Sequence, residues 1–213
     1  MARIVVIGGH GKVGLQLARV LTDRGDEVTS VFRNPDQADD VAATGATPAV
    51  ADIERLDTDA LAGLLAGHDA VVFSAGAGGG NPARTFAVDG VAAIRVIDAA
   101  ARAGLKRFVM VSYFGAGPDH GVPSENSFFP YAEAKAAADA HLRASGLQWT
   151  VLGPGRLTLE PATGRIALGQ GKGEVSRADV ALVAAAALAD DSTVGRTIDF
   201  NNGDTPIAEA LGT

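Results

Sequence analysis

The stretch RIVVIGGHGKVG, residues 3–14, decides the fold, because an uninterrupted apolar run leads directly into a turn with four glycines. The apolar residues from Ile4 to Ile7 are typical of a short buried β-strand. From residue 12 onward apolar residues recur at helical spacing, and Gly25 marks the end of that helix. The stretch therefore predicts a strand, a glycine-rich turn and a helix that open a β-α-β unit.

The glycines of this turn follow the spacing G-x-x-G-x-x-G, at positions 8, 11 and 14. Gly8 permits a tight turn, Gly11 lets the backbone approach a pyrophosphate, and Gly14 lets the helix pack on the strand. The helix N-terminus adds free N–H groups and a partial positive charge. A turn of purely structural use is the alternative, but this setting favours a phosphate cradle. The residues predicted to contact a cofactor here are Gly8, His10, Gly11, Lys12, Val13 and Gly14.

Apolar runs of strand length alternate with helical patterns over most of the chain. The strand candidates are residues 3–8, 27–32, 47–52, 69–76, 106–112 and 148–155. The helix candidates are residues 12–25, 34–44, 57–67, 82–104 and 131–146. Because these strands are apolar on both faces, the alternation predicts an α/β fold: a Rossmann-like, doubly wound parallel sheet with helices on both faces.

The pattern weakens after Gly155. A helix over 174–190 follows a short strand, residues 195–203 form a late strand, and 206–211 a last helical turn. We expect one domain over residues 1–213, with a Rossmann core at 1–154 and a small C-terminal, substrate-side portion at 155–213 that caps the carboxyl edge of the sheet.

Composition excludes several classes of function. The net charge is −7 and no stripe of Lys and Arg is present, which argues against a nucleic-acid partner. The chain has no cysteine, which removes disulfides, thiolate metal sites and cysteine nucleophiles, and we expect no metal site. Apolar runs are too short for a membrane span, and the first strand is too short for a signal-peptide core. We therefore expect a cytoplasmic protein without a membrane partner.

The end of the second predicted strand bears on the choice of cofactor. In many NAD-binding domains an acidic residue there binds the ribose 2′-hydroxyl, whereas this chain has Phe32 and Arg33. A guanidinium can bind a 2′-phosphate and stack on adenine. Arg33 therefore favours NADP, and NAD remains the alternative. The structural alternative is that Arg33 is only a solvent-exposed residue at the end of a strand.

Tyr131 and Lys135 are four residues apart, so they share one face of a predicted helix. An ammonium group beside a phenol lowers the pKa of that phenol, which can then exchange a proton with a substrate oxygen. Ser112 ends the fifth predicted strand, at the edge where open α/β sheets bind ligands. Its hydroxyl can hydrogen-bond the same oxygen.

The segments GGHGKVG, VMVS and YAEAK resemble the glycine turn, the serine strand and the Y-x-x-x-K helix of the short-chain dehydrogenase/reductase superfamily. The resemblance is closest to the atypical members, small NAD(P)-binding proteins that include NmrA-like regulators and flavin or biliverdin reductase B. It implies hydride transfer with NADPH, with Ser112, Tyr131 and Lys135 in the catalytic positions.

The resemblance extends over nearly the whole chain. Asp52 and Ile53 resemble the acidic-hydrophobic pair that contacts adenine in this family, and Ser74, Ala75 and Gly76 resemble the segment that passes under the adenine ribose. It also assigns Pro154 to cofactor contact. Where the family has Arg-Pro-Gly, this chain has Gly153, Pro154 and Gly155, so a side chain near the nicotinamide is lost.

The connection at 113–131 holds several aromatic residues, a composition that suits the walls of a site for a flat, conjugated substrate. The same rings could instead anchor the loop to the core. His120 within it is either a second proton donor or a solvent-exposed residue. The segment GAGGGN, residues 76–81, is either a flexible element close to the nicotinamide or a plain linker.

Three functional classes are compatible with these features. An NAD(P)H-dependent oxidoreductase acting on a small carbonyl, quinone or flavin-like substrate is favoured, because a cofactor-sensing regulator has no need of a tuned phenol. A sugar-nucleotide epimerase or dehydratase needs a larger substrate domain than the residues after Gly155 provide. The alanine-rich helices at 82–103 and 131–145 suit packing either on the sheet or against a second subunit, so a monomer and a homodimer both remain open.

Overall fold

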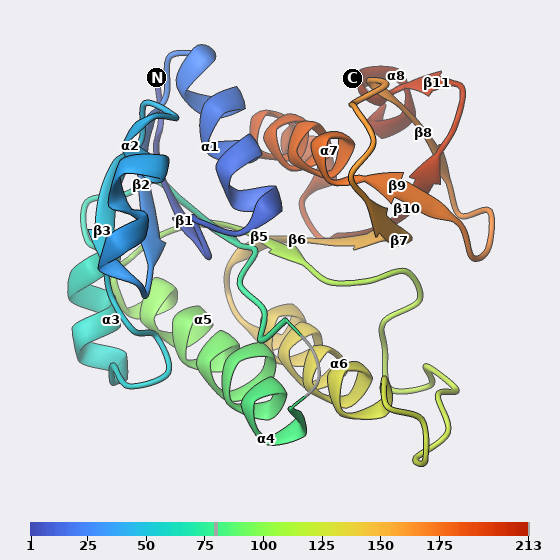
Figure 1. The fold of residues 1–213 in the computed structure, drawn as a ribbon, viewed down its shortest axis with the longest axis horizontal. Helices are drawn as coiled ribbons and strands as arrows, with labels where there is room; N and C mark the ends of the chain where they lie inside the picture. The colour runs from blue at the N-terminus through green and yellow to red at the C-terminus, as the bar shows by residue number, and fades with distance from the viewer. Residues whose placement is uncertain (79–80, 213) are drawn as a thin grey trace.

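In the computed structural model, which describes residues 1–78 and 81–212, a nine-stranded sheet crosses the protein and helices cover both faces (Figure 1). Six parallel strands form its main part: β1 (Arg3–Ile7), β2 (Glu27–Phe32), β3 (Thr47–Val50), β4 (Ala70–Phe73), β5 (Arg107–Val111) and β6 (Gln148–Pro154). They lie in the order β3-β2-β1-β4-β5-β6, so the chain changes direction between β1 and β4. This order confirms the predicted doubly wound fold and opens a crevice at the carboxyl ends of β1 and β4.

The remaining strands come from the C-terminal part of the chain. β10 (Arg196–Asn202) pairs parallel to β6, β8 (Arg165–Leu168) pairs antiparallel to β10, and β11 (Thr205–Pro206) completes that edge. β10 joins the sheet because Ile198 and Phe200 alternate into the core. β7 (Arg156–Thr158) and β9 (Glu174–Ser176) form a separate parallel pair. The C-terminal part of the chain therefore extends the sheet as well as forming this pair.

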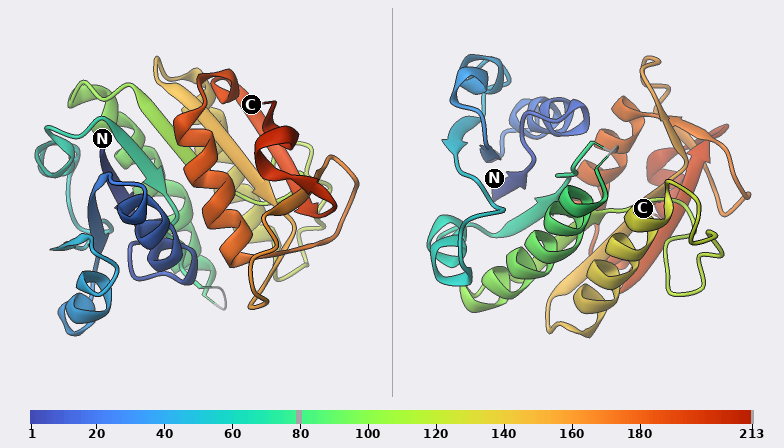
Figure 2. Two further views of the ribbon diagram at one scale, coloured as in Figure 1. Left: turned by 90° about the horizontal axis from the view of Figure 1, so that it is seen from above. Right: turned by 60° about the horizontal axis from the view of Figure 1, so that its bottom comes forward.

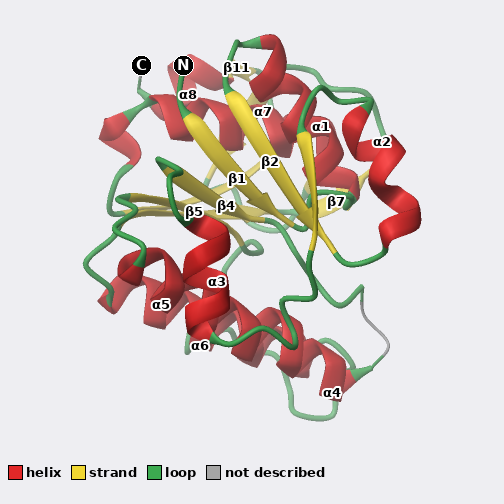
Figure 3. Ribbon diagram, turned by 90° about the vertical axis from the view of Figure 1, so that its left-hand side faces the viewer, coloured by secondary structure: helices red, strands yellow, loops and turns green. Residues whose placement is uncertain are grey.

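The helices divide into two layers, which Figure 3 shows on opposite faces of the sheet. One layer contains α1 (Lys12–Asp23), α2 (Ala38–Ala42), α7 (Arg177–Ala189) and α8 (Ile207–Leu211). The other contains α3 (Thr58–Leu65), α5 (Ala93–Arg102) and α6 (Phe129–Ala144). Figure 2 shows α1 beside α7 and α5 beside α6. Each layer buries its own apolar cluster against the sheet, so the site at the strand ends rests on two packed cores.

The helix expected over residues 82–104 is not a regular α-helix. It begins as α4 (Pro82–Thr85), widens into a π-helical segment at Phe86–Ala92, and continues as α5. Such widened turns often occur at functional sites. Here the π-helical segment carries the buried Asp89.

The short helical turns are Pro35–Gln37 and Asp191–Thr193. Across the described residues, no helix combines the length and the apolar character needed to cross a membrane.

Candidate active site and cofactor cleft

The glycine turn between β1 and α1 leaves almost no room for side chains. Gly8 has a φ of +88°, and a Cβ placed on it would lie 2.6 Å from the Ala75 backbone. A Cβ on Gly14 would lie 2.4 Å from the Gly8 carbonyl oxygen, and one on Gly11 would lie 3.0 Å from the same atom. Gly9, which the sequence reasoning did not assign, packs equally closely on Ser30.

Gly11 is the N-cap of α1, and no side chain among the described residues caps the helix there. The turn thus presents backbone N–H groups at a helix N-terminus, as an anion cradle requires.

A cavity of about 460 Å³ lies against this turn, within the range typical of small-molecule sites. It collects most of the predicted cofactor residues: Gly8, His10, Gly11, Arg33, Asp52, Ile53, Ser74, Ala75 and Gly76. These residues come from the ends of β1 and β2 and from the segments that follow β3 and β4. The parallel register brings them to one edge, so the cleft fits a dinucleotide: backbone donors in the middle, a guanidinium at one end and apolar walls.

Four predicted cofactor residues lie elsewhere. Val13 lines a second cavity, and Gly14 packs the helix against the turn. Lys12 is exposed at the first residue of α1, while Pro154 is buried in β6. His10 does line the first cavity, and its Nε2 lies 2.9 Å from Asp40 Oδ2 on α2.

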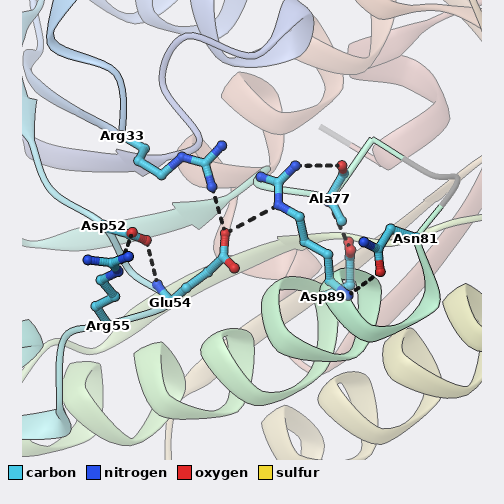
Figure 4. Close-up of polar contacts among 8 residues, drawn as sticks. Arg33, Asp52, Glu54, Arg55, Ala77, Asn81 and Asp89 are labelled. Atoms are coloured by element: carbon cyan, nitrogen blue, oxygen red, sulfur yellow. Dashed lines mark hydrogen bonds and ion pairs between the residues drawn. The ribbon is translucent and has the colours of Figure 1, made fainter.

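Charged side chains meet in the cleft beside the ends of β2 and β3 (Figure 4). Arg33 donates to Glu54 Oε1 at 3.0 Å, and Arg84 on α4 lies 3.5 Å from the same oxygen. Asp52 accepts the Glu54 N–H at 3.1 Å and pairs with Arg55 at 3.5 Å. Sequence reasoning missed Glu54 and Arg84, because no local pattern links a turn after β3 to α4.

A second cavity, of about 850 Å³, adjoins the first along Ser74, Ala75 and Gly76. Two of the predicted catalytic residues, Ser112 and Tyr131, line it. Its other walls include Asp89, Phe128 and Leu157. The segment after β4, residues 74–76, therefore forms a common border between the first cleft and a larger, more apolar chamber.

The third predicted catalytic residue, Lys135, is fully buried beneath this chamber. Its Nζ donates to the Val111 carbonyl at 2.8 Å, lies 3.2 Å from Met110 Sδ, and sits 5.7 Å from the centroid of the Phe73 ring. Burial lowers the pKa of Lys135, and the carboxyls of Asp139 and Asp89 oppose that change.

The expected lowering of the Tyr131 pKa is wrong for this arrangement. Burial raises the pKa of the Tyr131 phenol, and the nearby carboxyls of Asp89 and Asp139 add to the effect. Lys135 Nζ donates to the β5 carbonyl and makes no hydrogen bond to the phenol among the described residues, so the effect of burial prevails. Tyr131 therefore holds its proton at neutral pH.

Two buried carboxyls belong to the same region and were not predicted. Asp139 accepts the Ser112 hydroxyl at 2.6 Å, and Asp89 accepts the Ala77 N–H at 3.0 Å. Burial raises the pKa of both. A signal for Asp139 was available, because Tyr131, Lys135 and Asp139 repeat every four residues on one helix face. None was available for Asp89, whose orientation depends on the π-helical segment.

Aromatic residues of the 113–131 connection pack on one another at the chamber. The rings of Tyr113, Phe128 and Tyr131 have centroids 5.1–5.6 Å apart, and Phe128 remains 41% exposed. Phe128 and Tyr131 line the chamber, while Phe129 contacts His120 at 5.8 Å. The cluster thus anchors the loop and walls the cavity at once.

His120 lies outside both cavities and is not a solvent-exposed residue. Its side chain is 4% exposed, its Nδ1 accepts the Val122 N–H at 2.9 Å, and its Nε2 lies 2.8 Å from Glu133 on α6. It ties the loop to the helix through these contacts. In the segment 76–81, residues 79 and 80 lie outside the described residues, and Asn81 caps α4 by accepting the Arg84 N–H at 3.1 Å.

Comparison with known proteins agrees with this geometry. The sequence profile of the NAD(P)H-binding family matches residues 8–191. The uncharacterised sugar epimerase YhfK of Bacillus subtilis is 38% identical over 98% of both chains.

Two solved structures share the fold along nearly their whole length. A Bacillus halodurans protein, described by assignment as an NAD-dependent epimerase/dehydratase, has a TM-score of 0.91 at 34% identity and 99% coverage of both chains. The oxidoreductase YlbE of Lactococcus lactis has a TM-score of 0.88 at 28% identity, covering 98% of this chain and 94% of its own. The glycine cradle, the strand order and these matches lead to one conclusion: this chain belongs to the NAD(P)H-binding family, among the atypical short-chain dehydrogenases/reductases.

Proposed function

We propose that this protein is an NADP(H)-dependent reductase for a small carbonyl, quinone or flavin-like substrate. The observation that carries the proposal is the shared border of the two cavities at Ser74, Ala75 and Gly76. A dinucleotide laid along the first cavity would bring its nicotinamide end to the chamber of Ser112 and Tyr131. When bound, that cofactor supplies a hydride.

The roles of the chain's own residues follow from their protonation. Reduction of a carbonyl adds a hydride to carbon and a proton to oxygen, and a phenol that keeps its proton at neutral pH can deliver the second. Tyr131 is the proton donor to that oxygen in this proposal. Ser112 donates its own proton to Asp139, so it offers the chamber a hydrogen-bond acceptor rather than a donor. Lys135 is a positioning residue, because its bond to Val111 fixes α6 against β5.

The chamber supports the substrate class. Phe128, Tyr131 and Leu157 give it flat, apolar walls, while Ser112 and Asp89 place polar groups at its inner end. Such a mixture suits a planar conjugated molecule that carries one reducible oxygen or nitrogen. The oxidoreductase assignment of the Lactococcus lactis relative supports the same reaction type.

A cofactor-sensing regulator is the second candidate. The observation that favours it is the bond of Lys135 to Val111, which leaves Tyr131 without the neighbouring ammonium of a tuned phenol. The Bacillus subtilis relative carries the name of an uncharacterised sugar epimerase, so an epimerase is a third candidate. It would return its cofactor unchanged, so net consumption of NADPH separates it from a reductase.

The test is a panel of aldehydes, ketones, quinones and flavins with NADPH and NADH, followed by loss of absorbance of the reduced nicotinamide. We expect turnover with at least one planar substrate. Tight NADPH binding without turnover of any compound favours the sensor. Conversion of a nucleotide sugar without net NADPH loss favours the epimerase.

A further inference from the structure

Two arginines from distant parts of the chain converge on a single carboxylate oxygen in the cleft beside the ends of β2 and β3. Arg33 Nη1 lies 3.0 Å and Arg84 Nε lies 3.5 Å from Glu54 Oε1. The three residues follow β2, follow β3 and lie on α4, and all three line the same cavity. Figure 4 shows the Arg33 side chain pointing toward the Glu54 carboxylate.

The guanidiniums of Arg33 and Arg84 form an anion-binding site, and the carboxylate of the protein's own Glu54 occupies it. Arg84 is held in place by a second contact, because its Nη1 donates to the Ala77 carbonyl at 3.3 Å. The Glu54 side chain is 23% exposed, against 53% for Arg33 and 39% for Arg84. The guanidiniums therefore remain open to the cleft, while the carboxylate lies deeper between them. With one carboxylate against two guanidiniums, the group keeps a net positive charge.

The sequence already predicts Arg33 at the 2′-phosphate of NADP(H). We infer that Arg84 joins it there, and that Glu54 is an internal anion which this phosphate displaces. The inference rests on the proposed function for its choice of ligand. A phosphate carries more charge than a carboxylate and can accept hydrogen bonds from both guanidiniums at once. Glu54 holds the two arginines together without ligand and lowers the affinity for the phosphate by competing with it.

A different use of Glu54 makes opposite predictions. In NAD-binding domains an acidic residue accepts hydrogen bonds from the adenine ribose. If Glu54 did so, its neutralisation would weaken the binding of ligands that lack the 2′-phosphate. If the three charged residues served only to tie α4 to the sheet, neutralising Glu54 would leave the affinity unchanged for ligands with and without the 2′-phosphate.

The experiment compares adenosine 2′,5′-bisphosphate with 5′-AMP by isothermal titration calorimetry, so it needs no turnover. Glu54→Gln should tighten the bisphosphate about 3–10-fold, because the competing charge is removed, and should leave 5′-AMP within about twofold. Arg84→Gln and Arg33→Gln should each weaken the bisphosphate about 5–30-fold with the same small effect on 5′-AMP.

Arg55→Gln is the matched control. It removes the same charge from the neighbouring residue, whose side chain is 87% exposed and pairs with Asp52 instead of Glu54. It should leave the ratio of the two affinities within about twofold of the wild-type value. Asp59→Asn, at a residue that is 79% exposed and pairs with Arg102, controls for the loss of a negative charge.

Three results would overturn the inference. One is weaker 5′-AMP binding by Glu54→Gln without a gain for the bisphosphate. Another is an effect of Arg84→Gln no larger than that of Arg55→Gln. The third is equal binding of both ligands by the wild-type protein. If the protein shows the expected affinity ratios but turns over no substrate, the phosphate site is supported and only the proposed reductase function is refuted.

Discussion

Ser112 donates its hydroxyl to Asp139 Oδ2 over 2.6 Å, which couples the end of β5 to the middle of α6. Asp139 is fully buried, and its other oxygen, Oδ1, has no hydrogen-bond partner among the described residues. Burial raises the pKa of this carboxyl, although Lys135 and Ser112 oppose the shift. The Ser112 proton is thus engaged behind the chamber, and its lone pairs are left for a substrate.

Asp139→Asn should make stability less dependent on pH on the acid side. With a raised pKa, the folded protein keeps a proton that the unfolded chain releases, so the free energy of unfolding falls as pH rises through that window. Asparagine removes this contribution. Urea unfolding at intervals from about pH 4 to 6 measures the difference. Part of the slope should remain, because burial also raises the pKa of Asp89 and Asp199. Parallel profiles for variant and wild type would contradict the prediction.

Tyr131→Phe should lower carbonyl reduction about 10²–10⁴-fold while folding and NADPH binding stay nearly unchanged. The loss should be much smaller for a quinone or flavin, because hydride transfer to these acceptors needs less help from a protein acid. Steady-state kinetics with each substrate class measures both. Tyr113→Phe is the control: its ring lies 5.6 Å from Tyr131, and its buried hydroxyl has no partner among the described residues. Equal losses in the two variants would remove Tyr131 from the mechanism.

Gly11→Val should abolish or weaken dinucleotide binding by at least about 100-fold and leave a folded protein. The backbone at Gly11 has a φ of −62° that any residue adopts, but the side chain would stand where the pyrophosphate must approach. Fluorescence titration of NADPH measures the affinity, and circular dichroism the fold. Unchanged affinity would mean that the turn is structural.

Gly14→Ala should destabilise the fold itself, by about 1–3 kcal/mol, because its Cβ would lie 2.4 Å from the Gly8 carbonyl oxygen. Gly63→Ala, on α3 with open space around it, should instead stabilise by about 0.5–1 kcal/mol. Chemical denaturation of both variants compares them. Similar effects at the two sites would show that Gly14 is not a packing glycine.

Gly153→Ala should lower the free energy of unfolding, because the new methyl group would meet the side chain of Asp199. A Cβ on Gly153 would lie 1.8 Å from Asp199 Oδ1, since β6 and β10 pair these residues directly. We expect a loss of about 1–3 kcal/mol in the wild-type background and much less in an Asp199→Ala background. A double-mutant cycle on the free energy of unfolding measures the coupling, and additive effects would refute it. The carboxylate of Asp199 occupies the space that the family's arginine side chain would need at its base.

The sequence by itself determined the parts of this protein that depend on neighbours along the chain. RIVVIGGHGKVG predicts a strand, a turn and a helix because apolar periodicity and the freedom of glycine act over a few residues. The alternation of such units predicts the parallel sheet, and parallel strands place their carboxyl ends at one edge. The cofactor candidates that follow β1 to β4 were therefore predictable as a group.

Only the tertiary structure decided which charges meet. Glu54 pairs with Arg33 and Arg84, Asp139 accepts a hydrogen bond from the Ser112 hydroxyl, and Lys135 donates to the Val111 carbonyl. These contacts join segments 21 to 30 residues apart. They depend on strand register, on the π-helical turn in the helix after β4, and on how deeply each group is buried. Because burial and partner choice set the pKa of a side chain, the spacing of Tyr131 and Lys135 could suggest a proton donor but could not fix the direction in which its pKa moves.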